Sequence, residues 1–244
     1  MPSLFVETVN PGAGSPLLLI CDHASKFIPA HLMDLGLAGT ERERHIAWDI
    51  GAASVTRQLA KLLGATAVLG GVSRLVIDLN RAPDDANAIP VQSDGTLVPG
   101  NQNLDSDRIN ERIRDYFTPY HAQVSAQIAR LQGLGLAPAL LAVHSFTPTM
   151  NGRRRPWHAG ILWNQDGRLA LALIEALRSE PGLCVGDNEP YSGRDLAYSL
   201  NTHAGDLGLL HAGIEIRQDL IETEDQAQDW ARLLARLLKN LVPI

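Results

Sequence analysis

Short apolar runs recur along the chain, and polar residues follow most of them. The clearest run, Leu-Leu-Leu-Ile at residues 17–20, continues directly into Cys-Asp-His-Ala-Ser. An apolar run without alternation is typical of a strand that is buried on both faces, as in a mostly parallel sheet. Runs of this kind predict strands over residues 5–9, 17–21, 65–69, 74–79, 139–143, 159–163, 183–185 and 214–217.

Segments with a helical period lie between these strands. Apolar residues recur at helical spacing between residues 41 and 63, and Gly64 suits the C-terminus of that helix. Further helices are predicted over 105–131, 167–177 and 225–241, with a helical turn over 30–35, and Pro119 should break the first of the three. Because strands alternate with helices, we predict an α/β fold with a largely parallel or mixed sheet.

The chain has 244 residues, enough for one large α/β domain, and it contains no repeat, linker or low-complexity tract. We therefore predict a single domain over residues 1–244. Residues 81–103 are rich in Pro, Asp, Asn and Gly and show no period. A loop of this length inside a compact domain is usually functional or mobile.

Charge and cysteine content narrow the range of partners. The net charge is −6, and the basic residues form no long run, which argues against nucleic acid or an anionic membrane as the main partner. Two cysteines make no disulfide framework, and no apolar run approaches the roughly 20 residues of a membrane span. Residues 1–5 lack a basic start and an apolar core, so we expect no signal peptide and a cytoplasmic location.

Several common motifs are absent from the sequence. It has no Gly-x-Gly-x-x-Gly dinucleotide fingerprint, no Gly-x-x-x-x-Gly-Lys-Ser/Thr phosphate loop and no His-Glu-x-x-His helix. It also lacks the Gly-x-Ser-x-Gly elbow of many serine hydrolases. The candidate chemistry is therefore carried by polar residues at the ends of the predicted strands.

Four predicted strands end in residues that can do chemistry: Asp22-His23, Asp78-Leu79-Asn80-Arg81, His144-Ser145 and Glu215-Ile216-Arg217. In α/β sheets the functional crevice lies beyond the carboxyl ends of the strands. Catalytic zinc usually takes three protein ligands and keeps one position open. His23 and His144 could supply two ligands and Asp49 the third. Glu215 would then be the free carboxylate that moves the proton of the attacking water.

Each of these residues also has an ordinary structural interpretation. A histidine after a strand often makes only structural hydrogen bonds, and Asp49 could be a helix-start residue favoured by the dipole. Glu215 could simply pair with Arg217 or Arg81, and Asp78 could hold Arg74 or Arg81 in place. The predicted helix would put His45 on the same face as Asp49, where it could support a ligand or replace one.

Arginines supply the second half of the predicted site. Arg74 and Arg81 lie at the two ends of one predicted segment, and Arg155 is the last residue of a short basic cluster before Pro156-Trp157. A guanidinium group matches a carboxylate bidentately, so these arginines favour an anionic substrate. Tyr191 lies in a loop that could cover the pocket and donate a hydrogen bond.

The chain resembles the N-formylglutamate amidohydrolase family, as a divergent branch. The matching segments span nearly the whole chain in order: 21–25 with Ile28-Pro29, 45–52, 73–81, 143–148, 155–157, 188–191 and 214–220. The Asp-Leu-Asn-Arg and His-Ser pieces are also similar to zinc carboxypeptidases and related deacylases. The resemblance implies a three-layer α/β/α fold of the zinc-carboxypeptidase type and an enzyme that hydrolyses linear amides with one zinc ion per chain.

The resemblance also implies roles for individual residues. His23, His144 and Asp49 would bind zinc, and Glu215 would be the general base and acid. Asn80 and Arg81 would bind the substrate carboxylate. Apart from the resemblance, we expect Arg81 to act in catalysis as well, and Arg74, Ser145, Arg155 and Tyr191 to join it in binding substrate. The carboxypeptidase pattern puts Glu three residues after the first His, but Lys26 stands there, so Asp22 and His45 remain rivals of Asp49.

We therefore expect hydrolysis of a small anionic N-acyl amino acid such as N-formylglutamate. One alternative is a zinc peptidase or cell-wall amidase, which would need a long open groove. Another is a non-catalytic anion-binding module on the same fold. The sequence leaves the acyl group, the amino acid, the physiological metal and the oligomeric state open.

Overall fold

The computed structural model describes residues 5–242. Residues 1–4 and 243–244 lie outside the described part. The expectation of no signal peptide rests mostly on residues 1–4, and the predicted domain includes both segments. No helix within 5–242 is long and apolar enough to cross a membrane.

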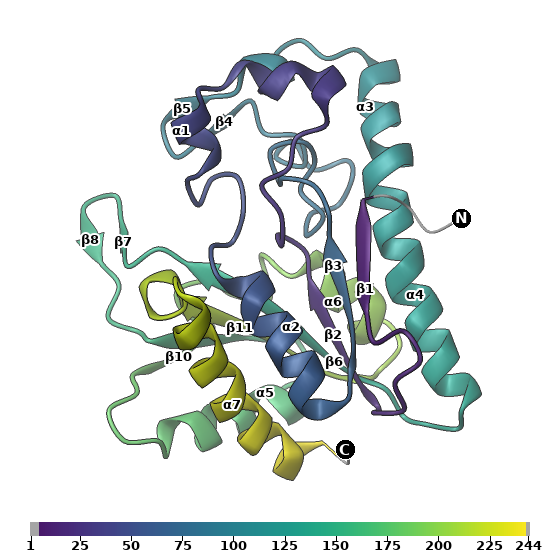
Figure 1. Ribbon diagram of the computed structural model, residues 1–244, viewed down its shortest axis with the longest axis vertical. Helices are drawn as coiled ribbons and strands as arrows, with labels where there is room; N and C mark the ends of the chain where they lie inside the picture. The colour runs from purple at the N-terminus through teal and green to yellow at the C-terminus, as the bar shows by residue number, and fades with distance from the viewer. Residues whose placement is uncertain (1–4, 243–244) are drawn as a thin grey trace.

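One mixed sheet forms the centre of the molecule (Figure 1). Its strand order is β1-β3-β2-β6-β11-β9-β10. The pairs β3–β2, β2–β6, β6–β11 and β9–β10 are parallel, whereas β1 and β9 run antiparallel to β3 and β11. The strands are β1 (Val6–Val9), β2 (Leu17–Cys21), β3 (Thr66–Gly70), β6 (Ala139–Phe146), β9 (Ala159–Leu162), β10 (Val185–Asp187) and β11 (Leu210–Arg217).

Helices cover both faces of the sheet, so the predicted three-layer α/β/α fold is confirmed (Figure 1). Successive side chains of β2 point to opposite faces. Leu17 and Leu19 join the core under α2 (Ala52–Leu63), α5 (Arg168–Arg178) and α7 (Glu224–Leu241). Leu18 and Ile20 join the core under α4 (Thr118–Gly133) and the short α6 (Tyr198–Leu200).

Local sequence explains most helix ends. Gly64 ends α2 in the left-handed conformation that glycine adopts without strain. Thr223 and Gln226 form a reciprocal capping box that starts α7. The predicted helix over 105–131 is α3 (Ser106–Arg112) followed by a π-helical turn (Ile113–Phe117) and α4, with Pro119 in the first turn of α4.

The helix predicted over residues 41–63 is wrong in its first half. Only α1 (Gly39–Arg42) and α2 are helical, and turns connect them. Gly51 takes a left-handed conformation, and a Cβ atom there would lie 2.1 Å from the carbonyl oxygen of Ile221. The chain therefore turns at Gly51 because only glycine fits against Ile221. His45 and Asp49 do not share a helical face.

The strand predicted over residues 74–79 is also wrong. This buried apolar segment lies outside the sheet, and side chains satisfy its carbonyl groups. Asn101 donates to the oxygen of Leu75 over 2.8 Å, and Arg112 donates to that of Val76 over 2.8 Å. The predicted strand over 183–185 is shifted to β10.

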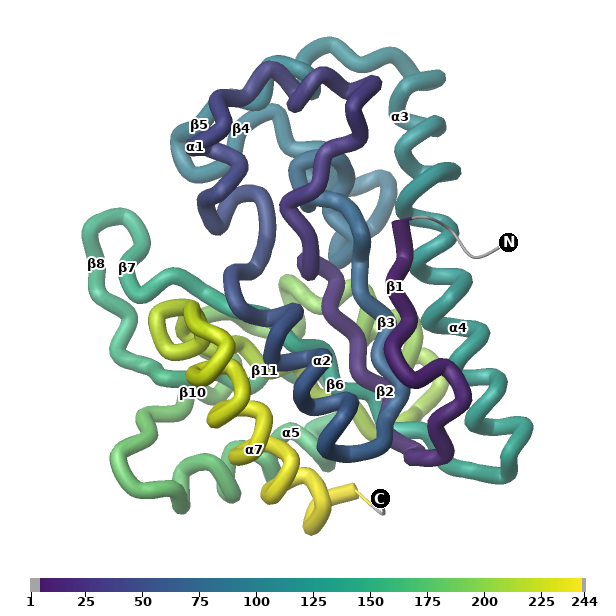
Figure 2. Tube along the Cα trace, in the orientation of Figure 1, coloured from purple at the N-terminus to yellow at the C-terminus, as the bar shows by residue number. Residues whose placement is uncertain are grey.

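Residues 81–103 contain a hairpin of β4 (Gln92–Ser93) and β5 (Thr96–Leu97). Arg44 fixes this hairpin by donating to Asp94 and Thr96 over 2.7 Å each. Figure 2 shows the hairpin beside α1, at the end of the molecule opposite to the end of α7. A second hairpin joins β7 (Thr149–Met150) to β8 (Arg153–Arg154).

Candidate active site

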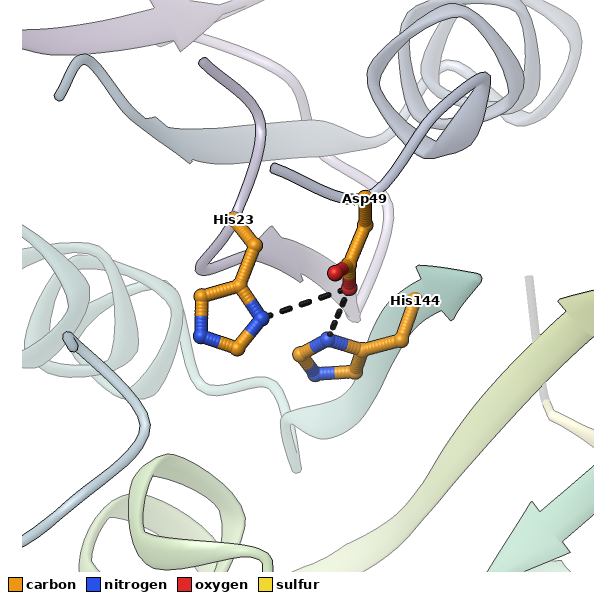
Figure 3. Close-up of side chains that lie close together, drawn as sticks. All are labelled: His23, Asp49 and His144. Carbon is orange, nitrogen blue, oxygen red and sulfur yellow. Dashed lines mark hydrogen bonds and ion pairs between the residues drawn. The ribbon is translucent and has the colours of Figure 1, made fainter. Parts of the chain in front are cut away.

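Three buried side chains from three separate segments meet at the carboxyl edge of the sheet (Figure 3). His23 follows β2, His144 lies inside the neighbouring strand β6, and Asp49 lies in the turn before α2. Because β2 and β6 are parallel, their carboxyl ends reach the same edge. The amide of Asp49 donates to the carbonyl of His23 over 3.0 Å, which ties the turn to that edge.

Both histidine rings present Nδ1 to the same oxygen of Asp49. Oδ2 of Asp49 lies 3.3 Å from Nδ1 of His23 and 2.9 Å from Nδ1 of His144. One ligand atom from each of the three residues lies within 4.8 Å of the others. Two imidazole nitrogens and a carboxylate oxygen in this arrangement could hold a metal ion.

The far side of each ring faces another carboxylate. Nε2 of His23 lies 2.7 Å from Oδ1 of Asp78, and Nε2 of His144 lies 3.2 Å from Oδ2 of Asp22. Partners of this kind orient histidine ligands at metal sites. Asp22 therefore lies on the opposite side of His144 from Asp49.

Each ring thus lies between two acidic groups. Burial lowers the pKa of His144, but its hydrogen bonds with Asp22 and Asp49 outweigh burial and raise that pKa well above its usual value. The pKa of His23 is also raised, because Asp78 and Asp49 outweigh burial and the charge of Arg74. A metal ion would therefore compete with protons for both rings.

Oε2 of Glu215 is a buried carboxylate oxygen without a hydrogen-bond partner within residues 5–242. Glu215 is opposite His144 in the parallel pairing of β6 and β11, and it is 7% exposed. Burial raises its pKa to about 7. The alternative pairing with Arg217 is wrong, because Arg217 bonds Asp219 over 2.7 Å.

The arginines differ in how fully they are already paired. Arg74 donates to Asp49 over 3.3 Å and to Asp78 over 3.0 Å, and Arg81 pairs with Asp85 over 3.1 Å. Asp78 therefore holds Arg74, as the structural interpretation expected. Arg155 has no carboxylate partner among the described residues.

Arg155 instead lies against three residues that line the pocket. It donates to the hydroxyl of Tyr191 over 3.0 Å and to that of Thr147 over 3.3 Å. Its guanidinium also lies over the ring of Tyr191 at 4.9 Å and over that of Phe146 at 5.7 Å. Cation–π contacts of this kind hold the positive charge in place without neutralising it.

A pocket of about 390 Å³ opens over the cluster. The hairpin of β4 and β5 contributes Gln92, Ser93 and Asp94 to its wall. The following sequence-predicted residues also line it: His23, Asp49, Arg74, Asn80, Arg81, His144, Ser145, Tyr191 and Glu215. Arg155 is not among the lining residues, and it contacts the pocket wall through Phe146, Thr147 and Tyr191. The hydroxyl of Ser145 donates to the carbonyl of Ile50 over 2.8 Å, and Asn80 accepts from the amide of Ser199 over 3.0 Å.

The two rivals of Asp49, Asp22 and His45, are not part of the converging group of ligand atoms. His45 lines the pocket, but its Nε2 faces Asp94 at 3.5 Å, and burial lowers its pKa. Sequence reasoning missed Tyr120 and Ser199, whose hydroxyl groups donate to Asp22 over 2.8 and 2.6 Å. No local sequence motif identifies either residue as part of the site. Tyr120 belongs to α4 and Ser199 to α6, and the packing of these helices on the sheet brings their hydroxyl groups to Asp22.

The fold and this cluster define an α/β protein with a candidate metal site at the edge of its sheet. A family model of N-formylglutamate amidohydrolases matches residues 15–222. The chain therefore belongs to the N-formylglutamate amidohydrolase family, whose members are amide hydrolases. None of the curated proteins compared with the chain matches it.

Three solved structures are similar to the chain to different degrees. Gene product Atu2144 from Agrobacterium tumefaciens is 38% identical, with a TM-score of 0.94 over 97% of this chain and 94% of that one. An N-formylglutamate amidohydrolase from Ralstonia eutropha JMP134 is 22% identical, with a TM-score of 0.72 over 97% and 98% of the two chains. An aspartoacylase family protein from Mesorhizobium loti is more distant, at 17% identity and a TM-score of 0.36 over 99% and 68%.

Proposed function

We propose that the protein is a zinc-dependent hydrolase that cleaves the amide bond of an N-acyl amino acid. His23, Asp49 and His144 would hold one zinc ion, and their converging ligand atoms fit the donor set of catalytic zinc. Zinc supplies a Lewis acid and lowers the pKa of a water molecule to about 7. Membership of the amidohydrolase family supports the reaction type, and N-formylglutamate is the first substrate to test.

Glu215 carries this proposal. A buried carboxylate with a free oxygen and a pKa of about 7 can accept a proton from water and release it again near neutral pH. Glu215 would take a proton from the attacking water and pass it to the nitrogen of the leaving amine. Its position opposite His144 keeps it in the pocket beside the candidate zinc ligands.

Arg155 and Tyr191 would bind the substrate carboxylate. The charge of Arg155 is not neutralised by any carboxylate in residues 5–242, and Tyr191 adds a hydroxyl group at the pocket wall. Asn80 and Arg81 would form a second contact from the pocket wall. Arg81 is also paired with Asp85 at 3.1 Å and with Asp78 at 3.6 Å, so its charge is less available than that of Arg155.

Arg74 and Ser145 also line the pocket, but they already use their donors on Asp49, on Asp78 and on the carbonyl of Ile50. We assign both to holding the Asp49 turn rather than to binding substrate. Positioning of the reacting groups in this way contributes directly to rate.

The size of the pocket favours a small substrate. Its volume of about 390 Å³ lies within the range of small-molecule sites, whereas a peptidase or cell-wall amidase would need a longer groove. A non-catalytic binding module would have no use for Glu215, which is costly to bury unpaired.

The first test is the zinc content of the purified protein beside His144→Ala, by elemental mass spectrometry, followed by hydrolysis of N-formylglutamate and other N-acyl amino acids. About one zinc ion per chain, lost in the variant, is expected. A wild-type protein that takes up no metal even when zinc is supplied would contradict the hydrolase mechanism and favour the binding module.

A further inference from the structure

Asp22 is a fully buried carboxylate that does not touch the pocket. It is 1% exposed, and it is absent from the pocket wall. Burying a charged group is costly unless it is paired and hydrogen-bonded, so the partners of Asp22 must offset the cost of its burial. Its neighbours along the chain, Leu18 and Ile20, belong to the apolar core under α4 and α6.

Two hydroxyl groups hold one oxygen of Asp22. Tyr120 of α4 donates to Oδ1 over 2.8 Å, and Ser199 of α6 donates to the same atom over 2.6 Å. Ser199 also reaches the carbonyl oxygen of Leu79 at 3.1 Å. Asp22 is therefore fixed from the outer helical layer and not from the pocket.

The other oxygen of Asp22, Oδ2, faces the candidate zinc ligand His144. Oδ2 lies 3.2 Å from Nε2 of His144, and no other described residue donates a hydrogen bond to it. His144 presents its opposite nitrogen, Nδ1, to Asp49. A neutral imidazole that binds metal through Nδ1 must carry its proton on Nε2, where Oδ2 of Asp22 is the available acceptor.

We propose that Asp22 is a positioning residue that holds the His144 ring through Nε2, with Tyr120 and Ser199 as its supports. This inference rests on the proposed function, since it assigns the partner of one zinc ligand. Asp22 thereby fixes both the tautomer and the direction of Nδ1, and its supports link the zinc site to α4 and α6. Partners of this kind typically change metal affinity about 10- to 100-fold when they are mutated.

The substitutions Asp22→Asn and Asp22→Ala separate this role from simple packing. Asparagine keeps an oxygen for Tyr120 and Ser199, but it puts an NH₂ group opposite Nε2, which favours the tautomer with the proton on Nδ1. A positioning role therefore predicts that Asp22→Asn binds zinc no better than Asp22→Ala. A purely structural role predicts that asparagine, which fills the site, is the milder change.

Zinc affinity would be measured by competition with a chelator, and the geometry of the site by the absorption spectrum of the cobalt-substituted protein. We expect Asp22→Asn to bind one zinc ion about 10- to 100-fold more weakly than the wild type, with an altered cobalt spectrum. Tyr116→Phe is the matched control, because Tyr116 is also buried and its hydroxyl lies 3.4 Å from His31. This control should leave affinity and spectrum unchanged.

The double variant Tyr120→Phe/Ser199→Ala keeps Asp22 and removes both of its supports, so it carries the test if Asp22→Asn does not fold. It should bind zinc more weakly than Tyr116→Phe. Affinities within about threefold of the wild type for the variants that fold, with unchanged cobalt spectra, would overturn the positioning role alone. A wild type that binds no zinc would overturn the proposed function together with this inference.

Discussion

Glu215→Gln should make the zinc-free protein more stable at alkaline pH while it removes activity. The side chain is buried at the edge of the sheet, and desolvation raises its pKa from 4.5 to about 7. Glutamine has nearly the same shape and carries no charge. The substitution therefore removes the cost of an ionised buried carboxylate without creating a cavity.

The size and the sign of the effect follow from the two pKa values. A folded-state pKa above the unfolded value means that the folded chain binds the proton more tightly. The stability that this proton confers is fully present below pH 4.5 and is lost as the pH rises through about 7. At 1.36 kcal/mol per unit, the wild type should lose about 3 kcal/mol by pH 8 and under about 1 kcal/mol by pH 5. The Glu215→Gln variant should show none of this loss, because glutamine does not ionise.

Denaturant unfolding of zinc-free wild type and Glu215→Gln at pH 5 and pH 8 would measure this difference. The variant should be more stable by about 3 kcal/mol at pH 8 and by under about 1 kcal/mol at pH 5. Glu222→Gln, at an exposed position, is the control and should change neither value. A variant that is no more stable than the wild type at pH 8 would refute the assignment of a buried, proton-binding carboxylate.

The same variant tests catalysis. General acid–base groups contribute about 10²- to 10⁴-fold, so Glu215→Gln should lose turnover by at least the lower factor. It should keep its zinc, because Glu215 is not among the three converging ligand residues. Substantial turnover in a zinc-loaded variant would rule out Glu215 as the base.

Three further predictions concern the site and its support. Arg155→Met should lower kcat/KM about 10- to 100-fold, mainly through KM, because it removes the unpaired charge beside Tyr191. Arg153→Ala in the exposed β7–β8 hairpin should leave kcat/KM unchanged, and equal effects of the two substitutions would contradict this role. Arg112→Met should lower the free energy of unfolding by about 3 kcal/mol, because acceptors on Val76, Gly100 and Asn101 lose a buried donor. Denaturant unfolding would measure this loss, and a loss under about 1 kcal/mol would contradict the role of Arg112. Zinc affinity should fall as the pH is lowered, because neighbouring carboxylates raise the pKa of both histidines and protons then compete with zinc. Calorimetry in buffers of different ionisation enthalpy should show proton release on binding, and a pH-independent affinity would contradict this prediction.

The sheet could be predicted from sequence because each main strand is a short apolar run. The run 17–21 matches β2, and 139–143 and 214–217 fall within β6 and β11. Neighbouring parallel strands carry their carboxyl ends to one edge, which explains why polar residues far apart in sequence, His23, His144 and Glu215, lie in one pocket.

Two segments could not be predicted because distant residues decide their conformation. Residues 74–79 have the composition of a buried strand, but Asn101 and Arg112 satisfy their carbonyl groups in place of a neighbouring strand. Residues 43–51 have a helical period, but Gly51 turns the chain against Ile221. In both cases the hydrophobic pattern reports burial correctly, and burial alone does not distinguish a strand or a helix from a packed turn.

The choice between Asp22 and Asp49 shows most clearly what three-dimensional placement adds. Both aspartates are adjacent to the His144 ring, and both are candidates for the acidic ligand from sequence alone. They approach different nitrogens: Asp49 shares the Nδ1 side with His23, whereas Asp22 faces Nε2 at 3.2 Å. In the proposed site the metal ion lies on the Nδ1 side, where a carboxylate can share it with the ring, whereas a carboxylate on the Nε2 side would orient the ring. Asp22 directly precedes His23 in sequence, and yet it contacts His144. Successive residues along an extended chain point to opposite faces of the sheet, so the side chain of Asp22 points towards Tyr120 and Ser199 and away from that of His23.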